Sequence, residues 1–159
     1  MKKELDKELY PDYVYPEFTP DPGKPFREPI AKLGKKITDR IPQKLGLKKI
    51  TRNDPEYWGL AGVLTDEEAL LALKLGVRKP KTLSEIVKIS GLEEKKCEAL
   101  LEEMSRKGLL EYNWENAAHE KQYVLPMYVP GCAEFFNMNA KILESNPEKI
   151  GRASCRERV

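Results

Sequence analysis

The chain has 159 residues, of which 40% are hydrophobic and 34% charged, so it has the size of one ordinary domain or of a smaller domain with a long arm. Its 28 basic and 26 acidic residues give a net charge of +2, which excludes a strong whole-molecule attraction to nucleic acid or to an anionic membrane surface. No apolar run reaches the roughly 18–20 residues that span a bilayer, and no apolar segment follows the first lysines as in a secretory signal. The cysteine usage is typical of a reducing interior, so a cytoplasmic protein is expected.

Residues 1–60 are predicted to form an extended arm with a short helix. Half of the 12 prolines lie in residues 1–30, where tyrosine and phenylalanine stand between them. Proline excludes a helix interior and restricts the residue before it, so this stretch is extended. Its aromatic residues indicate an arm that lies across another surface, either of its own domain or of a partner; a partly disordered tail is the alternative. The short helix is predicted before Pro42 from apolar residues spaced three and four apart: Ile30, Leu33, Ile37 and Ile41.

Residues 61–130 carry the clearest pattern. Thr65 and Thr82 are each followed three residues later by a glutamate, which is the capping-box signature of a helix start, and a third helix is predicted over 93–107. Glycines are expected to end these helices: Gly76, Gly91 and Gly108. The apolar positions expected to face the core are Ala69, Leu70, Leu73 and Leu75, then Leu83, Ile86, Val87 and Ile89, then Cys97, Leu100, Leu101 and Met104. A short helix, a turn and a longer helix are typical of a helix-turn-helix.

Two strands are predicted directly behind the third helix. Leu110, Tyr112 and Trp114 alternate with polar residues, and the alternation resumes over 122–125 after a polar turn. Pro126 predicts that the second strand lies at an edge or ends there. A β-hairpin behind a helix-turn-helix indicates a winged helix, so the expected fold class is mainly α with a small β-hairpin, preceded by the proline and aromatic arm.

The remaining residues divide at 149. Residues 131–149 restart a helical pattern, with one apolar face expected: Phe135, Phe136, Met138, Ile142 and Leu143. Residues 150–159 differ in character, because they hold three arginines without any period, and they resemble a translated cloning or adaptor read-through. We therefore expect the tail to be artefactual and the natural protein to continue beyond residue 149.

A winged helix is most often a DNA reader, but the expected DNA-facing surface is not basic. The outward side of the third helix carries three acidic and two basic residues, and residues 65–126 hold 12 acidic against 10 basic side chains. A DNA binder typically neutralises about 6–10 phosphates. DNA binding is therefore disfavoured, although the lysine-rich stretch 32–52 keeps it open as the alternative function.

No catalytic, cofactor-binding or metal-binding residue is predicted in this chain. Cys97 lies on an apolar helix stripe, where cysteine usually acts as a small hydrophobic residue, and no Cys-x-x-Cys spacing is present. His119 is the single histidine and is expected to be a solvated turn residue. The glycines at 59 and 62 lack the spacing and the lysine of a phosphate-binding loop.

Four stretches together carry a family resemblance. They are 53–60 (NDPEYWGL), 77–80 (VRKP), 108–116 (GLLEYNWEN) and 119–126 (HEKQYVLP). They resemble the amino-terminal region of large oxidoreductases of anaerobes that carry ferredoxin-type 4Fe-4S clusters and, in many members, a flavin (FAD) and pyridine-nucleotide module. The resemblance spans roughly residues 10–149. It implies that the clusters and the flavin belong to the remainder of the parent protein and that this chain is a non-catalytic, truncated docking region.

The predicted partners follow from that resemblance. The chain is expected to dock, without a membrane, on the remainder of the parent polypeptide or on a redox partner protein. The residues expected to contact that partner are aromatic: Tyr112, Trp114, Tyr123 and Tyr128. The alternative is a free-standing winged-helix transcriptional regulator that binds DNA.

Overall fold

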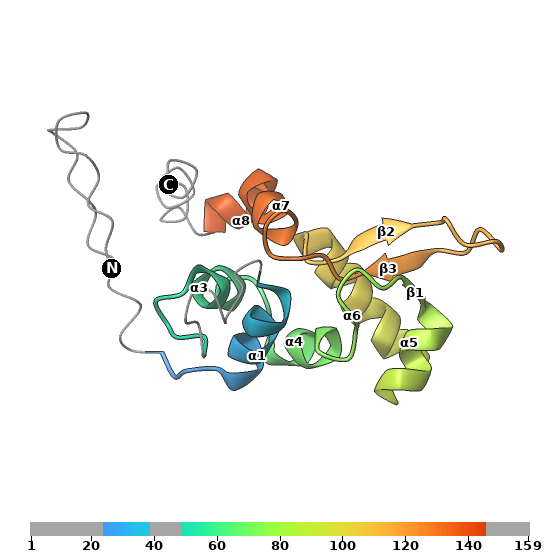
Figure 1. Cartoon of the computed structure of the whole chain (residues 1–159), viewed down its shortest axis with the longest axis horizontal. Helices are drawn as coiled ribbons and strands as arrows, with labels where there is room; N and C mark the ends of the chain where they lie inside the picture. The colour runs from blue at the N-terminus through green and yellow to red at the C-terminus, as the bar shows by residue number, and fades with distance from the viewer. Residues whose placement is uncertain (1–23, 39–48, 146–159) are drawn as a thin grey trace, which may run out of the picture.

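The computed structural model describes residues 24–38 and 49–145. Within these residues the chain is mainly helical, with a small three-stranded antiparallel sheet. In chain order the elements are α1 (Glu28–Ile37), α3 (Pro55–Ala61), α4 (Asp66–Ala72), β1 (Lys81–Thr82), α5 (Leu83–Ser90), α6 (Glu94–Lys107), β2 (Glu111–Asn113), β3 (Gln122–Val124), α7 (Cys132–Met138) and α8 (Ala140–Ser145). In Figure 1 the hairpin of β2 and β3 extends to the right, away from α1 and α3.

Helix α1 packs on α3 and α4. The helix predicted before Pro42 is confirmed over the described residues, because Ile30, Leu33 and Ile37 fall on one side of α1 and are each fully buried. Ile41 lies outside the described residues. Arg27 joins the three helices, since its guanidinium group donates to the carbonyl oxygens of Ala61 (3.0 Å) and Leu64 (2.7 Å) and to the carboxylate of Asp66 (2.7 Å).

The described end of the predicted arm lies on the chain's own domain. Phe26 stacks on Tyr57 with the ring centroids 4.7 Å apart, and the Arg52 guanidinium carbon lies 5.6 Å from the centre of the Phe26 ring. The backbone N–H of Arg27 donates to the Tyr57 hydroxyl at 2.9 Å. The other aromatic residues of the arm precede residue 24 and lie outside the described residues.

Both predicted capping boxes are present. The Thr65 hydroxyl accepts from the backbone N–H of Glu68 at 3.2 Å, and the Glu68 carboxylate accepts from the Thr65 N–H at 2.9 Å; Thr82 is capped in the same way. Helices α5 and α6 end where predicted, at Gly91 and Gly108, whose φ angles of 70° and 94° favour glycine. The first helix ends earlier than predicted, at Ala72 instead of Gly76.

Two predicted core positions are wrong. Leu70 is 52% exposed and Ile89 is 44% exposed. In α4, Ala69 is buried as predicted, and Leu71 and Ala72 are buried beside it. Successive helical residues point about 100° apart, so a seven-residue helix that buries those three leaves Leu70 on the outside. Ile89 lies in the last turn of α5, beyond the buried Ile86.

The sheet has the strand order β1-β3-β2. Of the two alternatives that Pro126 predicted, the second is confirmed: the strand ends before Pro126, and β3 is the central strand of the sheet. Lys81 and Thr82 pair with Tyr123 and Gln122 on its far side. A strand of two residues is too short to show alternation, so the sequence pattern did not reveal β1.

The expected single apolar face after residue 131 is also corrected. The chain forms two short helices, α7 and α8, because Asn139 is extended (φ −87°, ψ 104°) and caps the second one by accepting from the backbone N–H of Ile142. Phe136 is buried, whereas Phe135 and Met138 are 41% and 79% exposed.

One hydrophobic cluster runs through the described residues. It extends from Ile30 in α1 to Phe136 in α7 and includes residues of α3, α4, α5, α6 and β3. The divisions at 60/61 and 130/131 therefore do not coincide with a break in the core. The terminal division at 150–159 lies outside the described residues.

Candidate functional site

The most distinctive surface lies where α6 meets the β2–β3 hairpin. Gly108 ends α6 in a left-handed conformation, and the fully buried Leu109 with the nearly buried Leu110 anchors the start of β2. The hairpin then folds back beside α6, so that Glu102 of the helix meets side chains of both strands. We call this surface the α6–hairpin face and define it by Glu98, Glu102, Tyr112, Trp114 and Lys121.

Glu102 is the centre of this face. Its Oε1 atom accepts from Lys121 Nζ at 2.6 Å and from the Tyr123 hydroxyl at 2.6 Å, while Oε2 accepts from the Tyr112 hydroxyl at 2.8 Å. The hydrogen bonds from Lys121 and Tyr123, opposed by partial burial and aided by Tyr112, lower the pKa of Glu102 from 4.5 to about 2. The carboxylate is therefore ionised at any physiological pH.

The partners of Glu102 are shifted in the opposite sense. Burial alone would lower the pKa of Lys121, but the hydrogen bond and the charge of Glu102 outweigh it and raise that pKa. Burial first, and then the Glu102 carboxylate, raise the pKa of the Tyr123 hydroxyl above its usual range. Glu102 and Lys121 thus stay charged and Tyr123 stays neutral at neutral pH.

The structure divides the four predicted contact residues into two pairs. Tyr112 (39% exposed) and Trp114 (50% exposed) lie on the surface with their ring centroids 6.0 Å apart. Tyr123 and Tyr128 are each 3% exposed. The expectation of partner contact is therefore revised for Tyr123 and Tyr128, whose rings pack inside their own chain.

Tyr128 has a structural task. Its hydroxyl donates to the carbonyl oxygen of Pro55 at 2.9 Å, across 73 residues of sequence. The hydroxyl lies so close to Gly59 that a Cβ atom added there would overlap it. Gly59, which lacks the context of a phosphate-binding loop, lets the Tyr128 ring reach α3.

The cations of α6 are mostly engaged. Lys96 pairs with Glu67, Arg106 pairs with Glu103, and Lys107 pairs with the buried Glu68 at 2.8 Å. Lys95 is the only basic side chain of α6 that makes no ion pair with a described residue. By contrast, Glu98 is an exposed carboxylate on the same helix and has no ion pair within 24–38 and 49–145.

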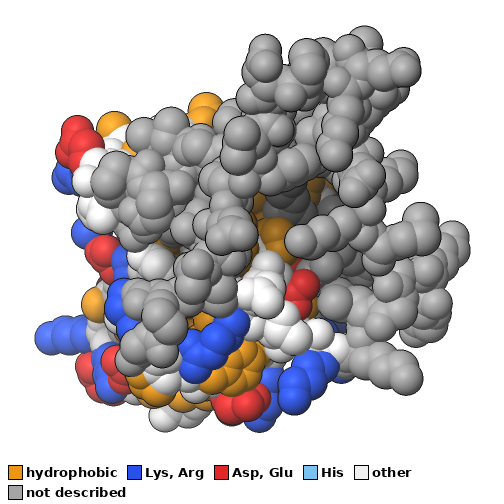
Figure 2. Space-filling model, turned by 90° about the vertical axis from the view of Figure 1, so that its left-hand side faces the viewer, with side chains coloured by type: hydrophobic (Ala, Val, Ile, Leu, Met, Phe, Trp, Pro, Cys, Tyr) orange, Lys and Arg blue, Asp and Glu red, His pale blue; other side chains and the backbone are white. Residues whose placement is uncertain are grey.

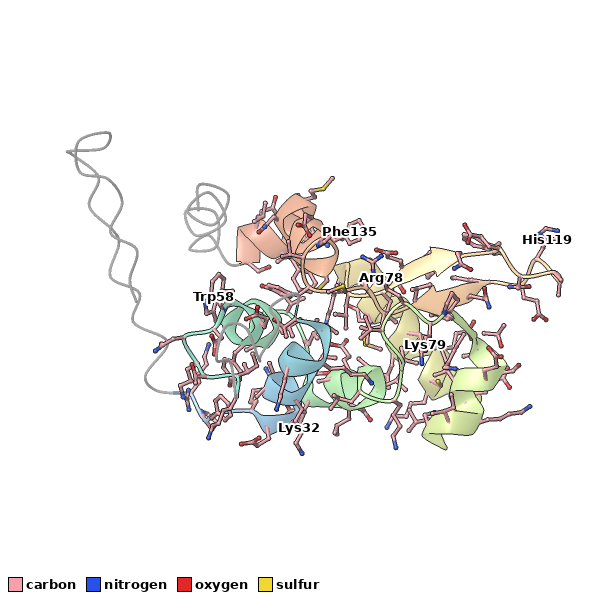
Figure 3. The ribbon with its side chains drawn as sticks, viewed as in Figure 1. Lys32, Trp58, Arg78, Lys79, His119 and Phe135 are labelled. Atoms are coloured by element: carbon pink, nitrogen blue, oxygen red, sulfur yellow. The ribbon has the colours of Figure 1, made fainter. Side chains whose placement is uncertain are left out.

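Helix α1, which carries the described lysines at the start of the lysine-rich stretch, lies away from the hairpin. Figure 3 shows Lys32 on α1 and His119 at the hairpin tip in opposite parts of the molecule. Lys36, also on α1, donates to the carbonyl oxygen of Leu73 at 2.7 Å. In the view of Figure 2, onto the end of the molecule away from the hairpin, basic and acidic side chains are interspersed around hydrophobic ones wherever described residues are visible. Residues 39–48 of the lysine-rich stretch lie outside the described residues.

The cysteines and the histidine are placed as follows. Cys97 and Cys132 are fully buried, and burial raises the pKa of the Cys132 thiol to about 12 and that of Cys97 above its usual value. His119 is exposed at the hairpin tip. Among the residues that the structure describes, no three His, Cys, Asp or Glu side chains are grouped so as to hold a metal ion.

Sequence reasoning did not identify Glu102 and Lys121 as a pair. The usable signal was weak: the outward side of the third helix is acidic, but which residue pairs with Glu102 across 19 positions depends on how the hairpin folds back. Comparison with known proteins found no matching family model, no matching curated protein and no matching solved structure. None of the described helices has the length and apolar character needed to cross a membrane.

Proposed function

We propose that residues 61–130 form a winged helix that docks on protein instead of reading DNA. The element order supports the fold: helix α4, strand β1, helices α5 and α6, then the hairpin, with β1 added to the far side of β3. In DNA-binding relatives of the helix-turn-helix, the second helix of the motif enters the major groove, and here that helix is α6. The α6–hairpin face is therefore the surface on which the function depends.

The observation that carries the proposal is the Glu102 carboxylate at the centre of that face. It stays ionised because Lys121 and two tyrosine hydroxyls donate to it. A phosphate backbone approaching α6 would meet the exposed Glu98, unpaired among the described residues, while the charge of Glu102 is matched by Lys121. Lys121 cannot pair with a phosphate without leaving Glu102, so its positive charge is already matched.

The magnitudes favour protein over nucleic acid. Binding of duplex DNA rests on about 6–10 phosphate contacts made by lysine and arginine. On α6, Lys95 alone is a cation without an ion pair among the described residues, while Tyr112 and Trp114 present exposed rings. Exposed aromatic rings are enriched at protein interfaces, whereas acidic side chains oppose polyanions.

The proposal extends to the parent protein through the sequence resemblance. We propose that this chain is the non-catalytic amino-terminal region of a cytoplasmic oxidoreductase with 4Fe-4S clusters and a flavin. The chain docks on the remainder of that polypeptide or on a redox partner. Two of the stretches that carry the resemblance, 108–116 and 119–126, lie on either side of the hairpin turn. The family resemblance and the acidic, aromatic surface thus concern the same part of the chain.

Fluorescence anisotropy of a labelled duplex of random sequence tests the docking proposal. The full chain is titrated at about 50 mM salt, and we expect no binding tighter than about 100 µM, the weak end of ordinary non-specific affinity. The charge-reversed variant Glu98→Lys with Glu115→Lys is the control and should gain measurable affinity. Salt-sensitive binding by the unmodified chain below 100 µM would instead establish the DNA-binding alternative.

The wider assignment has its own test. The gene is sequenced in its genomic context, beyond the codon for residue 149. In-frame Cys-x-x-Cys-x-x-Cys motifs downstream would support a parent protein with 4Fe-4S clusters. An in-frame stop codon at that point would contradict that assignment and leave the docking proposal to the anisotropy experiment.

A further inference from the structure

One exposed ring of the α6–hairpin face, that of Tyr112, and the buried ring of Tyr123 already hold a cation. Lys121 Nζ lies 3.9 Å from the centre of the Tyr112 ring and 5.3 Å from that of Tyr123. Both distances fall within the range of about 6 Å in which a cation is attracted to an aromatic face. The charge is matched by Glu102 at 2.6 Å. Two rings and one carboxylate therefore form a complete site for an ammonium group of the chain itself.

Trp114 continues this ring cluster outward. Its ring is tilted by 59° against that of Tyr112, and half of the residue is exposed. Tryptophan attracts cations more strongly than tyrosine or phenylalanine. No Lys or Arg of the described residues lies over its indole ring. The two tyrosine rings thus hold one cation, and Trp114 presents a third ring, one that attracts cations more strongly, to solvent.

Two exposed carboxylates of α6 and the hairpin are complementary in charge to a cation. Glu98 lies one helical turn before Glu102, on the same side of α6, and its charge acts on the Tyr123 hydroxyl. Glu115 follows Trp114 directly and is exposed. Neither carboxylate makes an ion pair with any residue in 24–38 or 49–145, whereas Lys121 is matched by Glu102.

We propose that the α6–hairpin face binds an arginine- or lysine-bearing segment of a partner polypeptide, with one cationic side chain over the indole of Trp114 and its charge matched by Glu98 and Glu115. The inference rests on the proposed docking function and names the chemistry of the partner. Arginine is the better fit, because a planar guanidinium group stacks on an aromatic face and pairs with carboxylates at its edge.

A second exposed apolar patch provides the comparison. Phe135 and Met138 on α7 are 41% and 79% exposed, and no lysine or arginine of the described residues lies over the Phe135 ring. Ile89 on α5 is likewise an isolated exposed apolar side chain. Substitutions at these positions remove apolar area without touching the α6–hairpin face.

The test uses two peptides that differ in charge alone. The full chain is titrated with the peptide Gly-Arg-Gly-Arg-Gly and with the same peptide carrying citrulline, which keeps the shape of arginine but is neutral. The readout is the NMR signal of each tryptophan indole N–H, assigned with the variant Trp58→Phe. We expect the arginine peptide to shift the Trp114 signal. The citrulline peptide should bind at least about two- to fivefold more weakly, as loss of a cation–aromatic contact predicts.

Variants locate the binding. Trp114→Ala should weaken binding of the arginine peptide at least about twofold, whereas Trp114→Phe keeps part of it. Glu98→Gln with Glu115→Gln should also weaken it and flatten its salt dependence. Met138→Ala and Ile89→Ala should bind as the unmodified chain does.

Three results would overturn the inference: no saturable shift of the Trp114 signal, equal affinity for the two peptides, or an equal loss in Met138→Ala. Circular dichroism of each variant shows that the fold is intact. The docking proposal is decided separately by the DNA titration, so failure here would leave it standing with a partner of different chemistry.

Discussion

Replacing Glu102 by glutamine removes the charge at the centre of the α6–hairpin face while keeping an oxygen for the tyrosine hydroxyls. Glutamine resembles the protonated form of Glu102, so the variant shows what ionisation contributes to stability. In the folded chain, Lys121 and Tyr123 hold the pKa of Glu102 at about 2, against an ordinary value of 4.5. The folded state therefore binds the proton less tightly than the unfolded state.

The magnitude follows from this difference in pKa. At about 1.4 kcal/mol for each tenfold change, the difference sets an upper limit of about 3 kcal/mol. The Glu102 side chain is 35% exposed, so solvent screening reduces the expected contribution to about 1–2 kcal/mol. Because the folded pKa is the lower one, the contribution is complete above pH 4.5 and is lost as the pH falls toward 2.

Urea unfolding of both proteins at pH 7 and pH 3 measures this contribution. Glu102→Gln should lower the free energy of unfolding by about 1–2 kcal/mol at pH 7, and the difference from the unmodified chain should shrink by about half or more at pH 3. Glu103→Gln is the matched control, because Glu103 pairs with the exposed Arg106 and should contribute about 0–0.5 kcal/mol. An equal loss in the two variants, or a Glu102 effect that does not change with pH, would refute the reasoning.

Two further predictions concern the core, and both are read from urea unfolding at pH 7. Gly59→Ala should destabilise the fold by about 1–3 kcal/mol, because the added methyl group overlaps the Tyr128 hydroxyl. In the background of Tyr128→Phe, which lacks that hydroxyl, the same change should cost clearly less free energy of unfolding. Equal costs in both backgrounds would contradict the contact. Lys107→Met should lower the free energy of unfolding by about 3–5 kcal/mol, because it leaves the buried Glu68 without its cation. Lys96→Met breaks an exposed pair and should cost about 0–1 kcal/mol. Similar losses in the two variants would show that the burial of Glu68 does not matter.

The helices of residues 61–130 were largely predictable because their signals are local. A capping box joins residues three positions apart, as at Thr65 and Thr82, and a glycine in the left-handed conformation ends a helix, as at Gly91 and Gly108. These interactions form within one turn of chain. Leu70 and Ile89 were misassigned because the direction of the core depends on which neighbouring helices pack on α4 and α5.

The candidate site was predictable only in part. Of the aromatic residues expected to contact a partner, Tyr112 and Trp114 are exposed, whereas the ring of Tyr123 is buried. Exposure of a strand residue depends on what covers its face, and for Tyr123 the cover is Glu102 and the surrounding part of α6. Tyr128 is covered by α3, which lies more than 60 residues earlier in the chain.

Residue order alone therefore determined where α5 and α6 begin and end, which positions alternate in the hairpin, and that the outward side of α6 is acidic. Tertiary structure decided that Glu102 meets Lys121, that Tyr123 and Tyr128 turn inward, and that β1 makes β3 a central strand. The physical reason is the separation of the groups involved. Caps and helix stops act over three or four residues, whereas the contacts that bury a ring or match a charge join residues 19 to 73 positions apart and exist only after the chain has folded.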